Sequence, residues 1–407
     1  MSILREIPPT AGFPIYAKDL LSLLSGKNCA GSLEGDFRNF LGAPYAKVTY
    51  SGTAAFYIIL ETIKKLSKRK TVIIPSFVCP LVPLAIKRAG LKTAVCDINA
   101  NDFGFDMAKL QKLCADNRDI LAIVPVHLGG IPVDLDAIQK ICAGKDIFIV
   151  EDCAQSLGAQ YNDSKIGTLG DFSFYSLCRG KGLTIYEGGV LVTRSNEYAP
   201  ILNETIRQFV KNDRLSETLK IAELWAYWAF YRPSLFWFAF KLPQNYWNYF
   251  RRPERAAGEY FDLNFPLHKV SGIRRSLGHI TFGRLEPEIE KQRQKAQYYI
   301  QGLKDSAGIR SVTERGSSKA TYPYLTIVFD DETRCANAKE TLINSGLGVS
   351  LVYLCAIADY AYLKLSADQD CTNARRLAKT HMTLSTSAFI GTPDQDAVIR
   401  KLKGLKT

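Results

Sequence analysis

Residues 71–97 read TVIIPSFVCPLVPLAIKRAGLKTAVCD, and this stretch decides the fold class. A β-branched run at 71–75 is followed by helical periodicity at 81–89 and by a second short apolar run at 93–97. A strand, a helix and a second strand in this order predict a strand–helix–strand unit of a parallel sheet.

The same alternation extends over residues 46–193. Further strands are expected at 46–50, 120–125, 147–151, 172–175 and 190–193, and further helices at 54–66, 107–115 and 135–143. The pattern predicts an α/β domain whose mostly parallel central sheet is covered by helices on both faces. Ligands of such sheets bind beyond the carboxyl ends of the strands, so functional residues are expected just after each strand.

The pattern changes after about residue 265. The expected elements there are a long charged amphipathic helix, a strand and two further helices, at 283–303, 322–329, 335–345 and 374–384. These features indicate a smaller α+β domain. We therefore expect a large domain at 1–255 and a small C-terminal domain at 256–407.

An aromatic-rich segment at 222–250 precedes this boundary. Its sequence at 224–250 is LWAYWAFYRPSLFWFAFKLPQNYWNYF, and it contains all four tryptophans. Arg232 and Lys241 interrupt it, so it lacks the roughly 20 apolar residues that a spanning helix needs. We expect a helical hairpin buried against the body or at a subunit interface. The alternative is a peripheral membrane contact, because aromatic residues beside the arginines that follow suit a headgroup boundary.

The composition is that of an ordinary globular protein: 407 residues, 47% hydrophobic and 23% charged. The net charge of +12 suits anionic partners, and charge alone does not choose among nucleotides, nucleic acid and acidic membranes. The ten cysteines and four histidines have neither CxxC nor HExxH spacing, so no metal site is expected. Scattered cysteines and an N-terminus without signal-peptide character predict reduced thiols in the cytoplasm.

Two segments at expected strand ends could bind an anion and a cation. SGTAA at 51–55 begins a helix, whose first amides suit a phosphate, although a simple N-cap has the same pattern. The strand at 147–151 ends in Glu151-Asp152. A half-buried carboxylate there needs a cationic or hydrogen-bonding partner. A protonated pyridine nitrogen is one such partner, and a helix cap or a salt bridge is another.

A third segment, CRGKGLTIYEGG at 178–189, places Lys181 between two glycines and before a strand. The amine of a lysine in such a pocket can form a Schiff base with an aldehyde. A solvated loop lysine is the alternative. An anion seat, a pyridinium partner and a Schiff-base lysine are together what pyridoxal 5′-phosphate (PLP) requires.

These segments together resemble the DegT/DnrJ/EryC1/StrS family of sugar aminotransferases, PLP enzymes of fold type I. The matching motifs in the large domain are SGTAA at 51–55, IPSF at 74–77, PVHLGGIPVDLDAI at 125–138, VEDCAQSLGA at 150–159, KIGTLGDFSFYS at 165–176 and KGLTIYEGG at 181–189. AKETLINSGLGVSLVY at 338–353 and ARRLAKTHMTLSTSAFI at 374–390 fit the small domain. The resemblance implies an aspartate-aminotransferase-like fold.

The resemblance also implies roles for single residues. Lys181 would bind PLP covalently and transfer the proton, Asp152 would pair with the pyridine nitrogen, and Gln155 would lie near the phenolic oxygen. The phosphate would be held by Gly52, Thr53 and Ser173.

The sequence departs from the family pattern beside the cofactor. Cys79 stands where the family usually has an aromatic residue over the ring, and Phe77 is a possible substitute. Ser173 precedes Lys181 by eight residues, whereas the family commonly has a spacing of five. We therefore expect a three-residue insertion before Lys181.

A further departure concerns the partner subunit. The family's Asn-Tyr-Arg segment, which reaches the partner's cofactor phosphate, corresponds to LHK at 267–269. Lys269, with His268 beside it, would take that role in a homodimer with shared active sites.

The implied function is transfer of an amino group from an amino acid, with glutamate expected, to a keto-sugar that is expected to be nucleotide-linked. Such reactions serve the biosynthesis of cell-surface polysaccharides, glycoconjugates or secondary metabolites. No nucleic-acid partner is expected. One alternative is a PLP-dependent sugar dehydratase, whose known members replace the lysine with histidine. The other is a non-catalytic protein of the PLP fold that acts in regulation or assembly.

Overall fold

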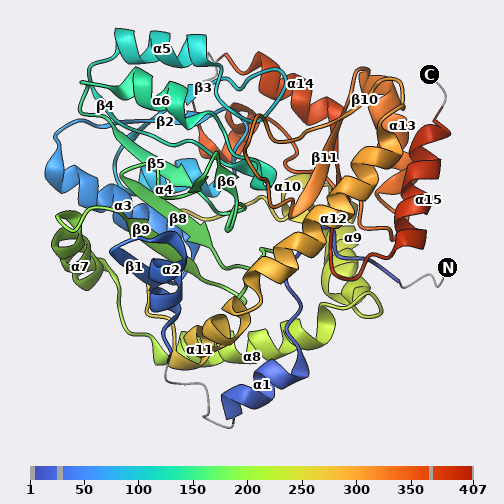
Figure 1. Cartoon of the computed structure of the whole chain (residues 1–407), viewed down its shortest axis with the longest axis horizontal. Helices are drawn as coiled ribbons and strands as arrows, with labels where there is room; N and C mark the ends of the chain where they lie inside the picture. The colour runs from blue at the N-terminus through green and yellow to red at the C-terminus, as the bar shows by residue number, and fades with distance from the viewer. Residues whose placement is uncertain (1–4, 25–30, 366–369, 406–407) are drawn as a thin grey trace.

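A seven-stranded sheet dominates the computed structural model, which describes residues 5–24, 31–365 and 370–405 (Figure 1). The strand order is β1-β9-β8-β5-β4-β2-β3. The strands are β1 (Tyr45–Thr49), β2 (Thr71–Pro75), β3 (Lys92–Cys96), β4 (Ile120–Ile123), β5 (Phe148–Asp152), β8 (Phe172–Ser176) and β9 (Gly189–Thr193). β9 is antiparallel to both of its neighbours, and the other pairs are parallel. The predicted mostly parallel sheet is confirmed.

Apolar helices cover both faces of this sheet. Successive strand residues point to opposite faces, so Val72 and Ile74 pack on one side and Ile73 on the other. The first side holds α3 (Gly52–Leu66), α4 (Leu81–Arg88) and α7 (Tyr198–Phe209). The second holds α2 (Leu33–Leu41), α5 (Met107–Asp116) and α6 (Leu135–Cys142). A short helix, α1 (Ala17–Leu24), and the hairpin of β6 (Gln160–Tyr161) and β7 (Ser164–Lys165) complete this part.

The C-terminal elements form a smaller α+β unit, on the right in Figure 1. Its antiparallel sheet has the order β10-β11-β12. Its elements are α12 (Leu285–Leu303), β10 (Ile309–Ser311), β11 (Tyr324–Phe329), α13 (Glu332–Leu342), α14 (Thr372–Thr380), β12 (His381–Ser385) and α15 (Thr392–Lys403). The helix before them, α11 (Gly272–Phe282), packs instead against α1 and α2. α12 runs diagonally between this unit and the large sheet (Figure 1).

The helix expected at 374–384 is wrong in its second half. α14 ends at Thr380, and the next five residues form β12. β12 pairs with β11, with Thr383 opposite Thr326 and His381 opposite Val328. The gain from this buried pairing exceeds the weak local helix preference of a threonine-containing stretch.

The N-terminal residues join the C-terminal unit. The Ile7 N–H donates to the Gly346 carbonyl at 3.0 Å, and the Ser385 hydroxyl donates to the Pro8 carbonyl at 2.6 Å. We propose a domain boundary near residue 255, with this N-terminal strap fastened to the second domain.

The aromatic-rich segment forms a helical hairpin. Its elements are α8 (Arg214–Phe230), at the lower edge of Figure 1, the π-helical turn η2 (Trp237–Lys241), α9 (Leu242–Tyr249) and α10 (Pro253–Ala256). Leu224 and Tyr227 of α8 are buried against the body. Its exposed large apolar side chains are Trp225, Phe230, Leu235, Phe238, Leu242, Tyr246, Tyr249 and Phe250. Within the described residues, no helix has the length and apolar character needed to cross a membrane.

Candidate active site

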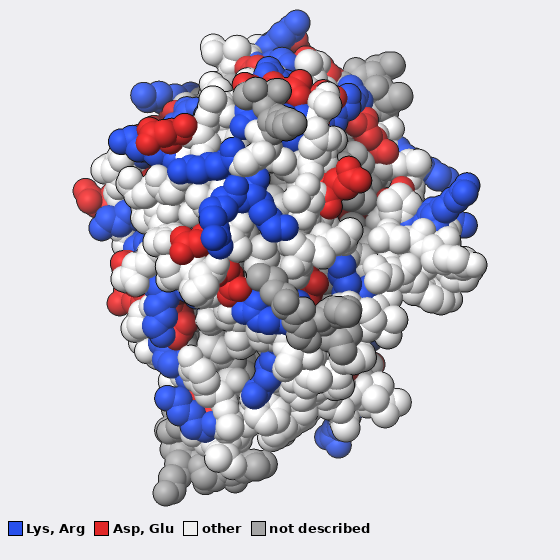
Figure 2. Space-filling view, turned by 90° about the vertical axis from the view of Figure 1, so that its right-hand side faces the viewer, with Lys and Arg blue, Asp and Glu red and all other residues white. Residues whose placement is uncertain are grey.

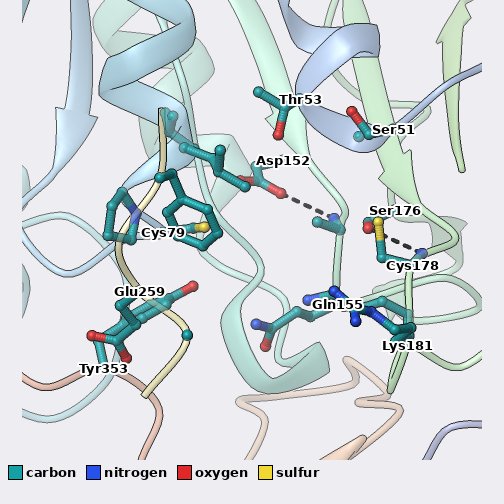
Figure 3. Close-up of a pocket in the computed structure, with 18 of the residues that line it drawn as sticks. Ser51, Thr53, Cys79, Asp152, Gln155, Ser176, Cys178, Lys181, Glu259 and Tyr353 are labelled. Carbon is teal, nitrogen blue, oxygen red and sulfur yellow. Dashed lines mark hydrogen bonds between the residues drawn. The ribbon is translucent and has the colours of Figure 1, made fainter. Parts of the chain in front are cut away.

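A cavity of about 690 Å³ lies where the parallel strands end (Figure 3). Five strands of the sheet that run in the same direction each end in, or are followed by, a residue that lines this cavity. For β1, β2, β4, β5 and β8 these residues are, in turn, Ser51, Cys79, His127, Asp152 and Ser176. Residues at or just after the ends of these strands therefore line the cavity, which is where the sequence predicts the functional residues.

The N-terminus of α3 forms one wall. The Ser51 hydroxyl caps the helix by accepting the Ala54 N–H at 3.1 Å. The first amides of the helix, those of Gly52 and Thr53, have no intrahelical partner, and both residues line the cavity. A Cβ at Gly189 would lie 2.3 Å from the Ser51 carbonyl carbon, so only glycine lets β9 start so close to this turn. The arrangement suits a phosphate group.

Two neighbouring carboxylates on β5 point to opposite sides of the sheet. The Glu151 oxygens accept the amides of Gly167 at 2.8 Å and Gly170 at 2.6 Å, which fastens the loop before β8. Asp152 faces the cavity and is only 5% exposed. Its Oδ1 accepts the Ala154 N–H at 3.0 Å, and the described residues offer no hydrogen-bond partner to Oδ2.

The electrostatics of Asp152 call for a cation. Burial raises the pKa of its carboxyl group to about 6, and the Ala154 amide, Lys181 and His127 offset only part of this effect. A protonated ring nitrogen beside Asp152 would stabilise the ionised form. The buried carboxylate thus fits the pyridinium of PLP.

Lys181 lies in a tight loop on the opposite wall, beside Gln155 in Figure 3. Gly180 precedes it with a φ of 70°, and a Cβ there would lie 2.5 Å from the Thr10 hydroxyl. The Gly182 carbonyl accepts the Phe13 N–H at 2.9 Å. The N-terminal segment therefore holds this loop against the cavity, and Lys181 is half-buried rather than a solvated loop lysine.

Gln155 presents a donor to the cavity. Its Oε1 accepts both the Gly129 N–H, at 2.9 Å, and the Tyr324 hydroxyl. Because these two donors occupy the oxygen, the NH₂ group is left for the cavity. A donor at this point suits the phenolic oxygen of PLP.

Ser173 is the wrong serine for the phosphate. Its side chain lies on the far face of β8, where the hydroxyl donates to the Gly167 carbonyl at 2.8 Å. Strand alternation brings Phe174 and Ser176 to the cavity instead. Ser176 precedes Lys181 by five residues, the spacing common in the family, so the predicted three-residue insertion is not needed. Counting back from Lys181 would have found Ser176 in the sequence.

Phe77 does not cover the cofactor position either. It is fully buried, and its ring packs edge-on against Tyr353 at 5.3 Å and His381 at 5.4 Å. Phe77 lies outside the cavity lining, whereas Cys79 is part of it. Burial raises the pKa of the Cys79 thiol to about 12, so the thiol is neutral.

Two residues of the wall beside Cys79 were not identified from the sequence. Glu259 and Tyr353 lie together below Cys79 in Figure 3. Burial raises the pKa of Glu259 to about 7, although it accepts the Tyr360 hydroxyl and, at 3.2 Å, the Leu354 N–H. Glu259 belongs to no motif and comes from a stretch without periodicity, so nothing in the sequence marked it.

The proposed partner-subunit residue lies outside this cavity. Lys269 is exposed, and it does not line the cavity of its own chain. His268 is buried, with its ring 4.1 Å from that of Tyr50 and its Nδ1 3.4 Å from Glu217. His268 is therefore engaged within its own chain, and the partner role of Lys269 stays a prediction.

Known proteins are similar to this chain in sequence. An uncharacterized protein, MJ1066, of Methanocaldococcus jannaschii is 31% identical over 40% of this chain and 42% of its own length. GDP-4-keto-6-deoxy-D-mannose 3-dehydratase of Yersinia pseudotuberculosis is 31% identical over 42% of this chain and 44% of its own. The matched region thus spans less than half of these two relatives. A Campylobacter jejuni protein, UDP-4-amino-4,6-dideoxy-N-acetyl-beta-L-altrosamine transaminase, is 22% identical over 89% of this chain and 85% of its own.

Solved structures show the same fold. Helicobacter pylori PseC, an aminotransferase, has a TM-score of 0.76 and 18% identity, covering 98% of both chains. The E. coli GDP-4-keto-6-deoxy-D-mannose-3-dehydratase has a TM-score of 0.74 and 19% identity, covering 98% of this chain and 100% of the other. The sequence model of one family matches residues 21–220 and 253–403. The chain belongs to the DegT/DnrJ/EryC1/StrS aminotransferase family.

Proposed function

We propose that the protein is a PLP-dependent aminotransferase that moves an amino group from glutamate to a keto-sugar carried on a nucleoside diphosphate. The observation that carries this proposal is the convergence of Lys181, Asp152 and the N-terminus of α3 in one cavity. The C. jejuni relative, named as a transaminase of a UDP-linked amino sugar, supports the same reaction class.

Each of these cavity residues has a separate role in the proposed reaction. The amides of Gly52 and Thr53, with the Ser176 hydroxyl, would hold the phosphate of PLP. Asp152 would keep a proton on the ring nitrogen. PLP, when bound, supplies an aldehyde for imine formation and a ring that withdraws electrons. Lys181 Nζ would take the proton from the α-carbon of the donor and return it during the transfer.

A sugar dehydratase is the second candidate, because the Yersinia relative bears that name. The dehydratases of the family carry histidine in place of the lysine, and this chain has Lys181. Transamination is therefore the proposal that the site favours. A non-catalytic member of the fold would have no need for a buried, unpaired carboxylate opposite a lysine.

The test starts from purified protein loaded with PLP. The protein should be yellow, glutamate should shift the absorbance band, and a keto-sugar nucleotide should restore it. With ¹⁵N-glutamate as donor, a screen of such acceptors should yield one ¹⁵N-labelled sugar product. A product that has lost water and contains no ¹⁵N would instead indicate the dehydratase. A colourless protein that cannot be reconstituted with PLP would contradict both the aminotransferase and the dehydratase proposal.

We further propose a cytoplasmic homodimer in which Lys269 of each subunit serves the site of its partner. The nine cysteines of the described residues are all free thiols, which suits a reducing compartment. On the face shown in Figure 2, lysines and arginines are interspersed with acidic residues. That mixed surface differs from the continuous basic stripe of nucleic-acid-binding proteins. Small molecules are therefore the proposed ligands.

The outer surface of the aromatic hairpin is the remaining candidate contact. We propose that its exposed apolar side chains make a peripheral membrane contact. Contact with a second subunit is the alternative. Sedimentation of the protein with anionic vesicles, with a Tyr249→Ser/Phe250→Ser variant as control, measures that contact.

A further inference from the structure

A second cavity, of about 570 Å³, adjoins the candidate active site. It lies between α8, α9 and the loop that carries Lys181. The two cavities share wall residues from the N-terminal strap, the lysine loop and the end of α10. These shared residues are Pro9, Thr10, Arg179, Ala257 and Gly258.

The walls of this second cavity come mainly from a part of the chain that the family does not share. The family match stops at residue 220 and resumes at residue 253. The unmatched residues between them supply an aromatic lining. Its main members are Tyr227, Phe230, Tyr231, Phe236, Phe240 and Trp247. The cavity is therefore an addition made by this chain.

Two arginines line this aromatic cavity, and each lies near an aromatic ring. The Arg179 guanidinium lies 5.3 Å from the Tyr186 ring, and that of Arg255 lies 5.1 Å from the Trp247 ring. Among the described residues, neither arginine forms a salt bridge within 4.0 Å or a side-chain hydrogen bond, although Arg179 interacts electrostatically with Glu223 of the same cavity. Arg179 also lines the first cavity, so it stands between the two. Guanidinium groups that form no salt bridge are well suited to bind phosphate oxygens.

The polar wall residues decide which ligand fits. Aromatic faces bind a nucleobase by stacking and also accept a lipid chain. Glu223 and Gln244 line the same cavity, together with the two arginines. A lipid chain would desolvate these groups without replacing their hydrogen bonds. A nucleobase can use an amide such as that of Gln244 as a donor and an acceptor.

We propose that the second cavity binds the nucleoside diphosphate part of the acceptor, a site that the family pattern does not include. The base stacks on the aromatic wall near Trp247, and Arg179 binds the diphosphate where the cavities meet. The sugar then extends toward Lys181. This inference rests on the proposed function and names the part of the chain that recognises the carrier.

Tryptophan fluorescence gives a local probe, since all four tryptophans belong to the hairpin. Titration of the PLP-loaded protein with UDP, GDP and dTDP, none of which carries a keto-sugar on its diphosphate, should give saturable quenching with at least one of them. Calorimetry should then show an affinity about tenfold or more weaker in Trp247→Ala and in Arg179→Gln. Trp225→Ala is the matched control, because Trp225 is 38% exposed and lies outside the cavity lining, and it should keep the affinity.

Three results would overturn the inference. One is failure of all three nucleotides to bind. Another is binding that Trp247→Ala and Arg179→Gln leave unchanged, which would place the nucleotide elsewhere. The third is tight binding of farnesyl diphosphate together with weak nucleotide binding, which would make the cavity a lipid-carrier site. The nucleotide titration is repeated on the protein without PLP, so a protein that binds UDP but never PLP would refute the proposed function and still support the cavity.

Discussion

Glu151 and Asp152 are adjacent carboxylates with separate tasks, and the pleat of β5 separates them. Glu151 is surrounded by backbone amides and holds the loop before β8. Asp152 faces the cavity, and the described residues give its carboxylate one hydrogen bond and no salt bridge. Burial without a counter-charge makes it a costly residue, and a bound cation would offset that cost.

Replacing Asp152 with Asn should stabilise the protein when PLP is absent. Burial raises the pKa of this carboxyl to about 6 from an ordinary 3.8, so the folded state resists its ionisation. The variant should gain about 2–3 kcal/mol in unfolding free energy near pH 7.5. The gain should shrink as the pH falls through about 6 and vanish below about 4, where both states are protonated.

Urea unfolding of the two apo proteins across this pH range measures the effect. In the presence of PLP the order should reverse, because asparagine cannot neutralise the ring nitrogen. A difference in stability that does not change with pH would contradict the account.

Ser176→Ala should weaken PLP binding about tenfold, because it removes a hydroxyl donor to a charged phosphate. Ser173→Ala should cost about 1 kcal/mol of stability and leave PLP affinity unchanged, since its hydroxyl serves only the Gly167 carbonyl. Absorbance titration with PLP distinguishes the two variants. The reverse pattern would restore Ser173 as the phosphate ligand.

Residue roles could be predicted from the sequence where a motif and a strand end coincide. Asp152 and Lys181 were found in that way, and both line the cavity. Ser173 and Phe77 were misassigned, because which side of a strand or turn a residue faces depends on register. Glu259 and Tyr353 come from distant parts of the chain, and only the folded chain brings them to the cavity.

At the scale of elements, the close approach of β9 to the turn before α3 shapes the phosphate seat. β9 begins at Gly189 beside the carbonyl of Ser51, and its remaining residues pair with β8 and β1. The EGG motif is thus a packing requirement of two elements that meet at the site.

Gly189→Ala should therefore displace the N-terminus of α3. The added methyl would lie 2.3 Å from the Ser51 carbonyl group, and we expect a loss of about 3 kcal/mol in unfolding free energy together with weaker PLP binding. Gly272→Ala is the control, since a Cβ there meets no atom within 4 Å. Denaturant unfolding and PLP titration measure both effects. Equal behaviour of the two variants would contradict this view of β9.

Helices and strands could be predicted from the sequence where the intrinsic preference of the residues agrees with their burial in the fold. The strand expected at 71–75 is β2 with the same bounds, because its β-branched apolar residues are buried on both faces. The stretch 374–384 failed, because pairing with β11 makes a strand of its second half. The helical hairpin expected for the aromatic-rich segment is present, and aromatic pairs along the segment, such as Tyr231–Phe236 and Phe236–Phe240, pack within it.

At the scale of the whole molecule, the proposed dimer makes the site a product of two chains. Lys269 lies on the surface of one chain and outside its own cavity, so its proposed role requires a partner. Most of the aromatic hairpin lies outside the residues that match the family, and it lines the second cavity while several of its apolar side chains are exposed.

Subunit mixing tests the shared site. Lys181→Ala and Lys269→Ala should each be inactive or strongly impaired as pure proteins. Unfolding and remixing the two should restore about a quarter of the wild-type activity, since half of the dimers would carry one intact site. Absence of recovery, with dimers confirmed by native mass spectrometry, would remove Lys269 from the partner's site.

The central claim is that Lys181 holds PLP, and reduction with borohydride tests it most directly. The reagent converts a lysine–PLP imine into a stable covalent bond, and peptide mapping by mass spectrometry locates the label. We expect the label on Lys181 alone, its loss in Lys181→Ala and its retention in Cys178→Ala. A label on any other lysine, or none in a protein saturated with PLP, would contradict the account.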